Sequence, residues 1–201
     1  MLLIKPGLRL YKTALDRAAQ EALLGDLRAV LREAPLFRPK MPKSGKDFSV
    51  RMSNCGPLGW VSDVSGYRYQ AHHPETDRLW PPMPESVLRL WRDYAECAIA
   101  PNACLINFYD AAARMGPHQD RDEADFSAPI LSLSLGDSCR FRYGGDSRRD
   151  PSATIRLESG DVLVFGGPAR RMFHGVDKIL PGTSTLLAPP GRINLTLRRA
   201  V

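Results

Sequence analysis

Two stretches of the chain carry apolar residues at the spacing of a helix. The first stretch has Thr13 as a plausible N-cap and Pro35 beyond its end, and the second follows Pro84. Stripes of this kind usually pack onto a sheet, so we expect two helices with buried apolar faces ahead of the sheet. The first stripe consists of Leu15, Ala19, Ala22, Leu23, Leu27, Val30 and Leu31. The second consists of Val87, Leu88, Trp91, Tyr94, Ala95 and Ala98.

The pattern changes after Ala103 to short strand-like runs separated by Gly, Asp and Pro. Such runs predict antiparallel β-structure, and an eight-stranded jelly roll accommodates them. The expected fold class is therefore α+β, mainly β, with the helices on the N-terminal side.

The last run, Arg192 to Arg198, alternates strictly between polar and apolar residues. Its polar residues Arg192, Asn194, Thr196 and Arg198 would share one face of a strand. An ordinary amphipathic strand with a solvated polar face has the same pattern. Because guanidinium groups bind carboxylates through two hydrogen bonds, the two arginines are also the expected clamp for a dicarboxylate.

Composition indicates one globular domain: 201 residues, 43% hydrophobic and 25% charged. No apolar run reaches the length of a membrane span, and the four cysteines form no C-x-x-C pair. We expect a cytoplasmic monomer with buried, reduced thiols and no membrane association.

The net charge of +6 fits a partner that carries phosphates. Basic residues crowd one stretch in which Asp47 is the only acid, and a solvated loop would explain them equally well. These residues are Arg38, Lys40, Lys43, Lys46 and Arg51.

His118 and Asp120 are two positions apart, so on a strand their side chains leave the same face. His174 follows the apolar run Asp161 to Phe165 and completes a set of two histidines and one carboxylate. Such a set leaves open positions on Fe(II), which suits dioxygen chemistry. The spacing alone is a weak signal, since His118 could be a surface turn residue. The adjacent His72 and His73 are rival ligands, but neighbouring strand residues point to opposite faces.

These features, with several motifs in order along the chain, resemble the AlkB family of Fe(II)/2-oxoglutarate-dependent dioxygenases, and specifically its bacterial nucleic-acid repair branch. The resemblance runs from about residue 36 to residue 199. It implies one domain over 1–201: a double-stranded β-helix (jelly roll) over about 103–199, flanked by N-terminal helices, and a nucleotide-recognition lid over about 36–81. The additional motifs are Asn54 to Trp60 followed by Tyr67, Ala103 to Tyr109, Pro129 to Gly136 and Ser159 to Gly167.

The resemblance also implies the site. His118, Asp120 and His174 would bind Fe(II), with 2-oxoglutarate and dioxygen as co-substrates. Arg192 would hold the distal carboxylate of 2-oxoglutarate with help from Tyr109 and Asn194, while Arg198 and Asn107 would lie nearer the metal-bound end. Substrate contacts would come from Met52, Trp60, Tyr67, Asp122 and Arg148, although Arg149 is nearly as plausible as Arg148.

The activity that follows is oxidative dealkylation of N-alkylated bases, such as 1-methyladenine and 3-methylcytosine, in single- or double-stranded DNA, with RNA as a second substrate. Trp60 would stack on one face of the base with the His118 ring near the other, and Tyr67 would contact the backbone. Two alternatives remain. One is an oxygenase that modifies RNA or hydroxylates protein, and the other is a non-catalytic jelly-roll binding module.

Overall fold

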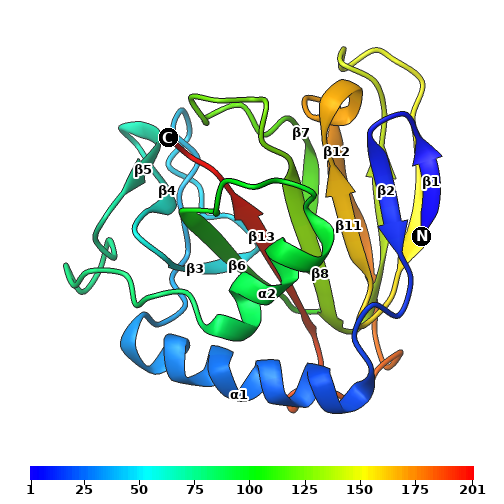
Figure 1. Ribbon diagram of the computed structural model, residues 1–201. Helices are drawn as coiled ribbons and strands as arrows, with labels where there is room; N and C mark the ends of the chain where they lie inside the picture. The colour runs from blue at the N-terminus through cyan, green and yellow to red at the C-terminus, as the bar shows by residue number, and fades with distance from the viewer.

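Two antiparallel sheets pack face to face in the computed structural model, which describes residues 1–201 (Figure 1). The strands are β1 (Leu2–Lys5), β2 (Leu8–Tyr11), β3 (Arg51–Cys55), β4 (Gly59–Asp63), β5 (Gly66–Gln70), β6 (Ala103–Tyr109), β7 (Met115–His118), β8 (Ile130–Gly136), β9 (Ser138–Tyr143), β10 (Ala153–Leu157), β11 (Val162–Phe165), β12 (His174–Leu180) and β13 (Arg192–Arg198). The major sheet has the order β1-β2-β11-β8-β13-β6-β3, and the minor sheet has the order β10-β9-β12-β7. Strands β4 and β5 form a separate hairpin.

Strands β11, β8, β13 and β6 of the major sheet, together with the four strands of the minor sheet, make the eight-stranded jelly roll. The prediction of a mainly β fold with flanking helices is thereby confirmed. The sheet begins earlier than expected, however. Strands β1 and β2 precede both helices and pair with β11, and β3 lies between the helices in sequence and pairs with β6. Within the range 36–81, β3 is thus the edge strand of the major sheet.

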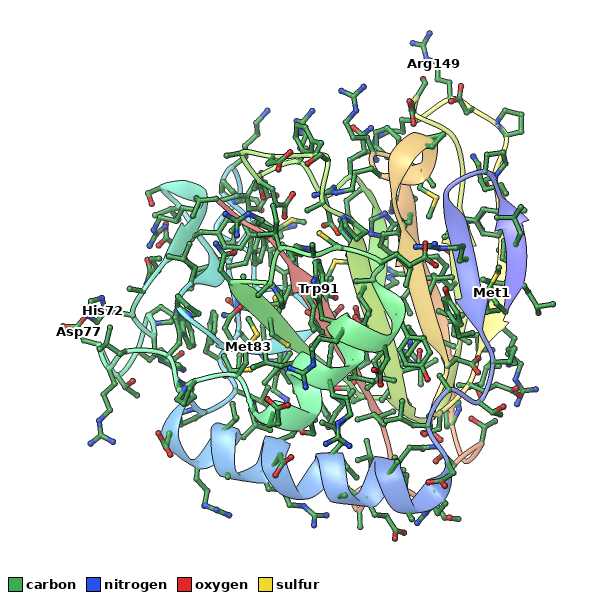
Figure 2. The ribbon with its side chains drawn as sticks, in the orientation of Figure 1. Met1, His72, Asp77, Met83, Trp91 and Arg149 are labelled. Carbon is green, nitrogen blue, oxygen red and sulfur yellow. The ribbon has the colours of Figure 1, made fainter.

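The helices α1 (Arg17–Glu33) and α2 (Glu85–Tyr94) cover the outer face of the major sheet (Figure 1). Leu23 and Leu27 of α1 and Trp91 of α2 are buried in one cluster with Leu133 and Leu195 of the sheet. Figure 2 shows Trp91 on α2, in front of the sheet. A short 3-10 turn, η1 (Gly167–Ala169), joins β11 to the segment before β12. Neither helix is both long and apolar enough to cross a membrane.

The start of α1 differs from the prediction. The N-cap is Asp16, whose carboxylate accepts a hydrogen bond from the Ala19 amide at 2.8 Å. Thr13 lies before the helix with a φ of 48°. Its backbone N–H donates to Asp161 at 3.0 Å, and this bond fixes the preceding segment to the sheet and delays the helix.

Three alanines of the predicted stripes are exposed, since Ala19 and Ala22 face outward and Ala98 lies beyond the end of α2. Gln20 takes a buried place on α1 instead. The side-chain amide of Gln20 is satisfied there, because it donates to the Leu15 carbonyl at 2.8 Å and accepts from the Ser159 hydroxyl at 2.6 Å. Of the four free cysteines, Cys97 is half-buried rather than buried.

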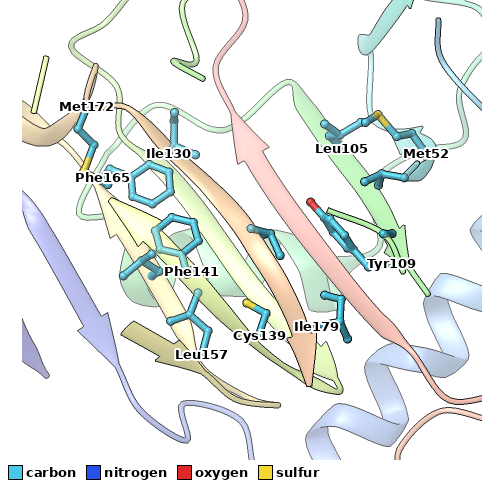
Figure 3. Close-up of a cluster of buried hydrophobic side chains, with 14 of the residues drawn as sticks. Met52, Leu105, Tyr109, Ile130, Cys139, Phe141, Leu157, Phe165, Met172 and Ile179 are labelled. Atoms are coloured by element: carbon cyan, nitrogen blue, oxygen red, sulfur yellow. The ribbon is translucent and has the colours of Figure 1, made fainter. Parts of the chain in front are cut away.

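A second apolar cluster lies between the two sheets (Figure 3). Tyr109, Ile130 and Phe165 come from the major sheet, and Phe141 and Ile179 come from the minor sheet. This cluster occupies only part of the space between the sheets. The remainder is a cavity, and the polar face of β13 lines one side of it.

Candidate metal centre and co-substrate pocket

A cavity of about 710 Å³ opens between the sheets beside the β4–β5 hairpin. It brings together residues of ten strands that are far apart in the sequence, and every predicted site residue except Arg192 lines it. The predicted residues on its wall are Met52, Trp60, Tyr67, Asn107, Tyr109, His118, Asp120, Asp122, Arg148, His174, Asn194 and Arg198.

His118, Asp120 and His174 meet at one point of this cavity. Their candidate ligand atoms all lie within 4.8 Å of one another, and each histidine Nε2 is 3.7 Å from an oxygen of Asp120. His118 ends β7 and His174 begins β12, and these two residues are direct partners in the ladder of the two strands. The predicted convergence of the pair His118 and Asp120 is therefore present, with His174 beside it.

Both imidazoles are oriented for metal binding. Nδ1 of His118 lies 2.9 Å from the Gly116 carbonyl oxygen, and Nδ1 of His174 lies 3.1 Å from the Met172 carbonyl oxygen. A carbonyl can only accept, so each Nδ1 carries the proton and each Nε2 presents its lone pair to the shared point. Burial, followed by the neighbouring His118, lowers the pKa of His174 to about 4, so this ring is neutral at pH 7.

The carboxylate of Asp120 fits the same role. It is buried, and its Oδ2 has no hydrogen-bond partner. Burial alone would raise the pKa of Asp120, but Arg198 and the two histidines outweigh burial and keep the pKa below its usual range. A charged buried oxygen without a partner is costly, and a divalent cation between it and the two Nε2 atoms would satisfy it. These residues therefore suit a bound iron.

Arg192 is buried outside the cavity lining and is incompletely paired. One of its nitrogens donates to the Ser134 hydroxyl at 2.7 Å, whereas Nε and Nη1 have no partner. Tyr109 is its direct neighbour on β6. A buried guanidinium with two unpartnered nitrogens requires an anion, and the distal carboxylate of 2-oxoglutarate would supply it.

The polar face of β13 is buried rather than solvated. Neighbouring strands continue it with Ser132 and Ser134 on β8 and Asn107 on β6. Asn194 already donates to the Ser132 hydroxyl at 2.8 Å and to the Leu133 carbonyl at 2.9 Å, so both of its amide hydrogens are in use. Oδ1 of Asn107 has no partner. Asn107 is thus available for a ligand, while Asn194 would first have to exchange a bond.

An aromatic pair stands at the mouth of the cavity on the hairpin. The rings of Trp60 on β4 and Tyr67 on β5 stack at 5.5 Å between centroids, with an interplanar angle of 23°. The Trp60 indole N–H donates to Asp122 at 2.9 Å. Trp60 is half-buried and Tyr67 is exposed, so this pair presents aromatic surface to the cavity instead of filling the core.

The remaining predicted residues fall into two groups, those on the cavity wall and those away from it. Met52 is buried on the cavity wall, and Arg148 lies on the wall with its guanidinium 5.1 Å from the Phe173 ring centre. Arg149 is absent from the wall and points outward at the tip of its loop (Figure 2). The histidines of the other pair are remote from the metal site: His72 is exposed, and buried His73 bonds the Pro35 carbonyl at 2.8 Å.

The basic residues also fall into two groups, arginines that make contacts within the protein and lysines that are exposed. The guanidinium of Arg38 donates to the Phe48 and Ser49 carbonyls, and the guanidinium of Arg51 lies 4.7 Å from the Phe108 ring centre. The three lysines Lys40, Lys43 and Lys46 are exposed, and the only ion pair among them is a loose one, 3.9 Å between Lys40 and Asp47.

The sequence did not predict a buried polar network behind the candidate metal ligands. Glu123 lies between Arg170, at 3.2 Å, and Arg198, at 3.6 Å, and accepts from the Tyr69 hydroxyl. The alternation of Tyr67 and Tyr69 was a signal for Tyr69, since both leave the hairpin with strand periodicity. Glu123 and Arg170 lie in irregular segments, where no periodicity marks a buried position.

Comparison with known proteins identifies similar chains. Residues 7–198 match the 2OG-Fe(II) oxygenase superfamily. The chain is 51% identical to an alpha-ketoglutarate-dependent dioxygenase AlkB homolog of Caulobacter vibrioides, over 99% of this chain and 90% of that protein. It is 46% identical to the DNA N(6)-methyladenine demethylase ALKBH1C of Arabidopsis thaliana, over 49% of this chain and 24% of that protein. The solved structure of OsALKBH1 superimposes with a TM-score of 0.83 at 30% identity, covering 98% of this chain and 100% of that one.

Proposed function

The chain belongs to the AlkB family within the 2OG-Fe(II) oxygenase superfamily, and we propose that it oxidatively dealkylates nucleic-acid bases. It is an Fe(II)/2-oxoglutarate-dependent dioxygenase, as the sequence predicted. When bound, the iron supplies the redox chemistry that couples decarboxylation of 2-oxoglutarate to hydroxylation of a C–H bond. On a methyl group attached to a base nitrogen, that hydroxylation releases formaldehyde and the restored base.

The residues of the chain position the reactants. His118, Asp120 and His174 would hold the iron, and Arg192 would receive the distal carboxylate of 2-oxoglutarate through its unpartnered Nε and Nη1. Tyr109 stays a neutral donor because burial raises its pKa. Phe141 and Phe165 lie with their ring centres 5.8 and 5.0 Å from that of His174 and exclude water from this side of the site.

The observation that carries the nucleic-acid assignment is the aromatic pair Trp60 and Tyr67 at the mouth of the cavity that contains the triad. A base in a duplex cannot reach an enclosed metal, so it must leave the stack or come from a single strand. Extruded bases are held by stacking on aromatic side chains. Trp60 would provide one such face, with the His118 ring on the other side, and Asp122 and Arg148 would contact the base and its surroundings.

The same contacts are the basis for the substrate range that we propose. The substrates would be single- or double-stranded DNA carrying lesions such as 1-methyladenine and 3-methylcytosine, and RNA in addition. The Arabidopsis relative is named for a DNA demethylase activity, which supports nucleic acid over protein as the substrate class. We propose a cytoplasmic location, because free cysteines such as Cys55 and Cys104 are typical of a reducing compartment, and we propose in addition that the protein is a monomer.

The test is an assay of the purified protein with Fe(II), 2-oxoglutarate and matched oligonucleotides, with and without 1-methyladenine or 3-methylcytosine, in DNA and RNA. We expect mass spectrometry to detect loss of the methyl group only when iron and 2-oxoglutarate are both present. A methylated peptide or an unmodified oligonucleotide should not increase succinate formation. Hydroxylation of protein with no change in any methylated base would overturn the proposal.

A further inference from the structure

The hairpin that carries Trp60 is bonded to the metal-binding loop at two points. At the first, the Trp60 indole N–H donates to Asp122. At the second, the Tyr69 hydroxyl on β5 donates to Oε1 of Glu123 at 2.5 Å. Both acceptors lie within three residues of the metal ligand Asp120. The position of the hairpin and the position of the loop are therefore linked.

Glu123 is the centre of a buried ionic network. Only 1% of its side chain is exposed, and Arg170 and Arg198 flank it with 3% and 7% exposed. Arg170 also donates to the backbone carbonyls of Asp120 and Ala128, each at 2.9 Å, and so holds both ends of the loop segment. Breaking such a network is costly because it leaves a buried charge unpaired.

Arg198 connects this network to the metal ligand. It lies 2.8 Å from Oδ1 of Asp120 and donates to the Tyr69 hydroxyl at 3.2 Å. The Tyr69 oxygen thus accepts from a cation and donates to an anion. Burial raises the pKa of Tyr69, so the hydroxyl keeps the proton that it donates to Glu123. A continuous chain of contacts runs from the hairpin through Tyr69 and Arg198 to Asp120.

We propose that Tyr69 is a positioning residue that couples occupancy of the nucleotide-recognition hairpin to the metal and co-substrate site, acting through Glu123 and Arg198. The proposal rests on the proposed function and specifies how the same site is controlled by its substrate. Tyr69 itself is neither a candidate iron ligand nor part of the cavity lining.

The architecture of the hairpin explains why one hydroxyl has this effect. Strands β4 and β5 pair only with each other in a sheet of their own. A two-stranded hairpin is marginally stable in water, so its placement depends on anchoring side chains. Asn54 of β3 anchors β4 through two hydrogen bonds to the Trp60 backbone, of 3.0 and 3.1 Å. On β5, Tyr69 makes the only side-chain hydrogen bond to the loop that contains Asp120.

The experiment compares Tyr69→Phe with the parent protein. This change removes one oxygen and keeps the ring. The matched control is Tyr94→Phe, which also removes a hydroxyl that bonds a distant segment, the Ala14 carbonyl at 3.2 Å, on the far side of the major sheet. Three quantities are measured: amide hydrogen exchange of residues 59–70 in the metal-free protein, the KM for a methylated oligonucleotide, and the ratio of succinate formed to bases restored.

Tyr69→Phe should accelerate exchange in the hairpin and raise the oligonucleotide KM by about tenfold, the scale of a lost hydrogen bond to a charged group. The ratio of succinate to restored base should also rise, because substrate would no longer align the two sites. Tyr94→Phe should alter none of the three. Unchanged hairpin exchange, KM and ratio in Tyr69→Phe would overturn the proposal, as would effects equal to those of the control.

The same data separate the two proposals. If the parent protein restores no methylated base, the proposed function fails, whatever Tyr69 does. If the parent demethylates normally and Tyr69→Phe matches it in KM and ratio, only the coupling role of Tyr69 fails.

Discussion

The guanidinium of Arg198 lies 2.8 Å from Oδ1 of Asp120, so the strand that would hold 2-oxoglutarate also holds the carboxylate that would bind the metal. Burial would lower the pKa of Arg198, but Asp120 and its other buried neighbours raise the pKa well above its ordinary value. Both partners of the ion pair are therefore charged at neutral pH. The ion pair leaves Oδ2 of Asp120 free of hydrogen bonds, 3.7 Å from Nε2 of His174.

Arg198→Ala should lower both stability and metal affinity. Removing one partner of a buried pair typically costs about 3–5 kcal/mol, because the carboxylates of Asp120 and Glu123 would lose their shared cation. Urea unfolding of the metal-free protein measures the first effect, and titration with Mn(II) measures the second. Arg198→Lys, which keeps the charge, should recover part of both. Parent-like stability in Arg198→Ala would mean that the pair contributes nothing.

Arg192→Ala should raise the 2-oxoglutarate concentration needed for half-maximal activity by at least about 10–100-fold. Truncating one partner of a buried charge pair costs about 2–5 kcal/mol, and here the lost pair is with the co-substrate. Arg28→Ala, on the exposed side of α1, is the matched control and should change nothing. Steady-state kinetics with varied 2-oxoglutarate give the answer. An unaltered requirement in Arg192→Ala would remove Arg192 from the co-substrate site.

Trp60→Ala should weaken productive binding of methylated oligonucleotide by about 1–3 kcal/mol, the contribution of base stacking on an aromatic ring. The change also removes the Trp60 bond to Asp122. Trp60→Phe keeps a stacking face without the indole N–H, so it separates the two contributions and should lie between Trp60→Ala and the parent. Fluorescence anisotropy with a labelled oligonucleotide measures the affinities. Equal affinity in all three proteins would reopen the question of substrate class.

Replacing Lys40, Lys43 and Lys46 together with Ala should flatten the salt dependence of oligonucleotide binding. Each lost phosphate contact on a single strand reduces the log–log slope by roughly 0.7. Lesion preference should barely change, because phosphate contacts position the strand and base contacts specify it. The control replaces Arg28, Arg32 and Arg89, exposed on the helices, with the same change in charge. Parallel slopes for the parent and the lysine variant would show that these lysines are merely solvated.

Local periodicity accounts for what the sequence predicted. The alternation in Arg192 to Arg198 assigned each side chain of β13 to its face. The two-residue spacing of His118 and Asp120 predicted their convergence, although β7 ends at His118 and Asp120 lies just beyond it. Periodicity could not distinguish a solvated polar face from a buried one. That distinction depends on the minor sheet, which closes over the polar face of β13 and buries it.

The unpredicted parts depend on contacts between distant segments. Tyr69 and Glu123 are 54 residues apart, and Glu123 and Arg170 are 47 apart, so no local pattern joins them. The strands β1 and β2 have four residues each, too few for a periodic signal, and only pairing with β11 gives Leu8 and Leu10 their buried places. The helix start moved from Thr13 to Asp16 for the same reason, because Asp161 binds the intervening backbone.

The central claim is that His118, Asp120 and His174 bind the iron that demethylates a base held at Trp60. The most direct test is to quantify formaldehyde and succinate together in one reaction containing Fe(II), 2-oxoglutarate and a 3-methylcytosine oligonucleotide. We expect near-equal amounts from the parent protein, neither product after iron is removed by a chelator, and neither from folded Asp120→Ala. Full formaldehyde release by Asp120→Ala under limiting iron, or succinate without any formaldehyde from the parent, would contradict the account.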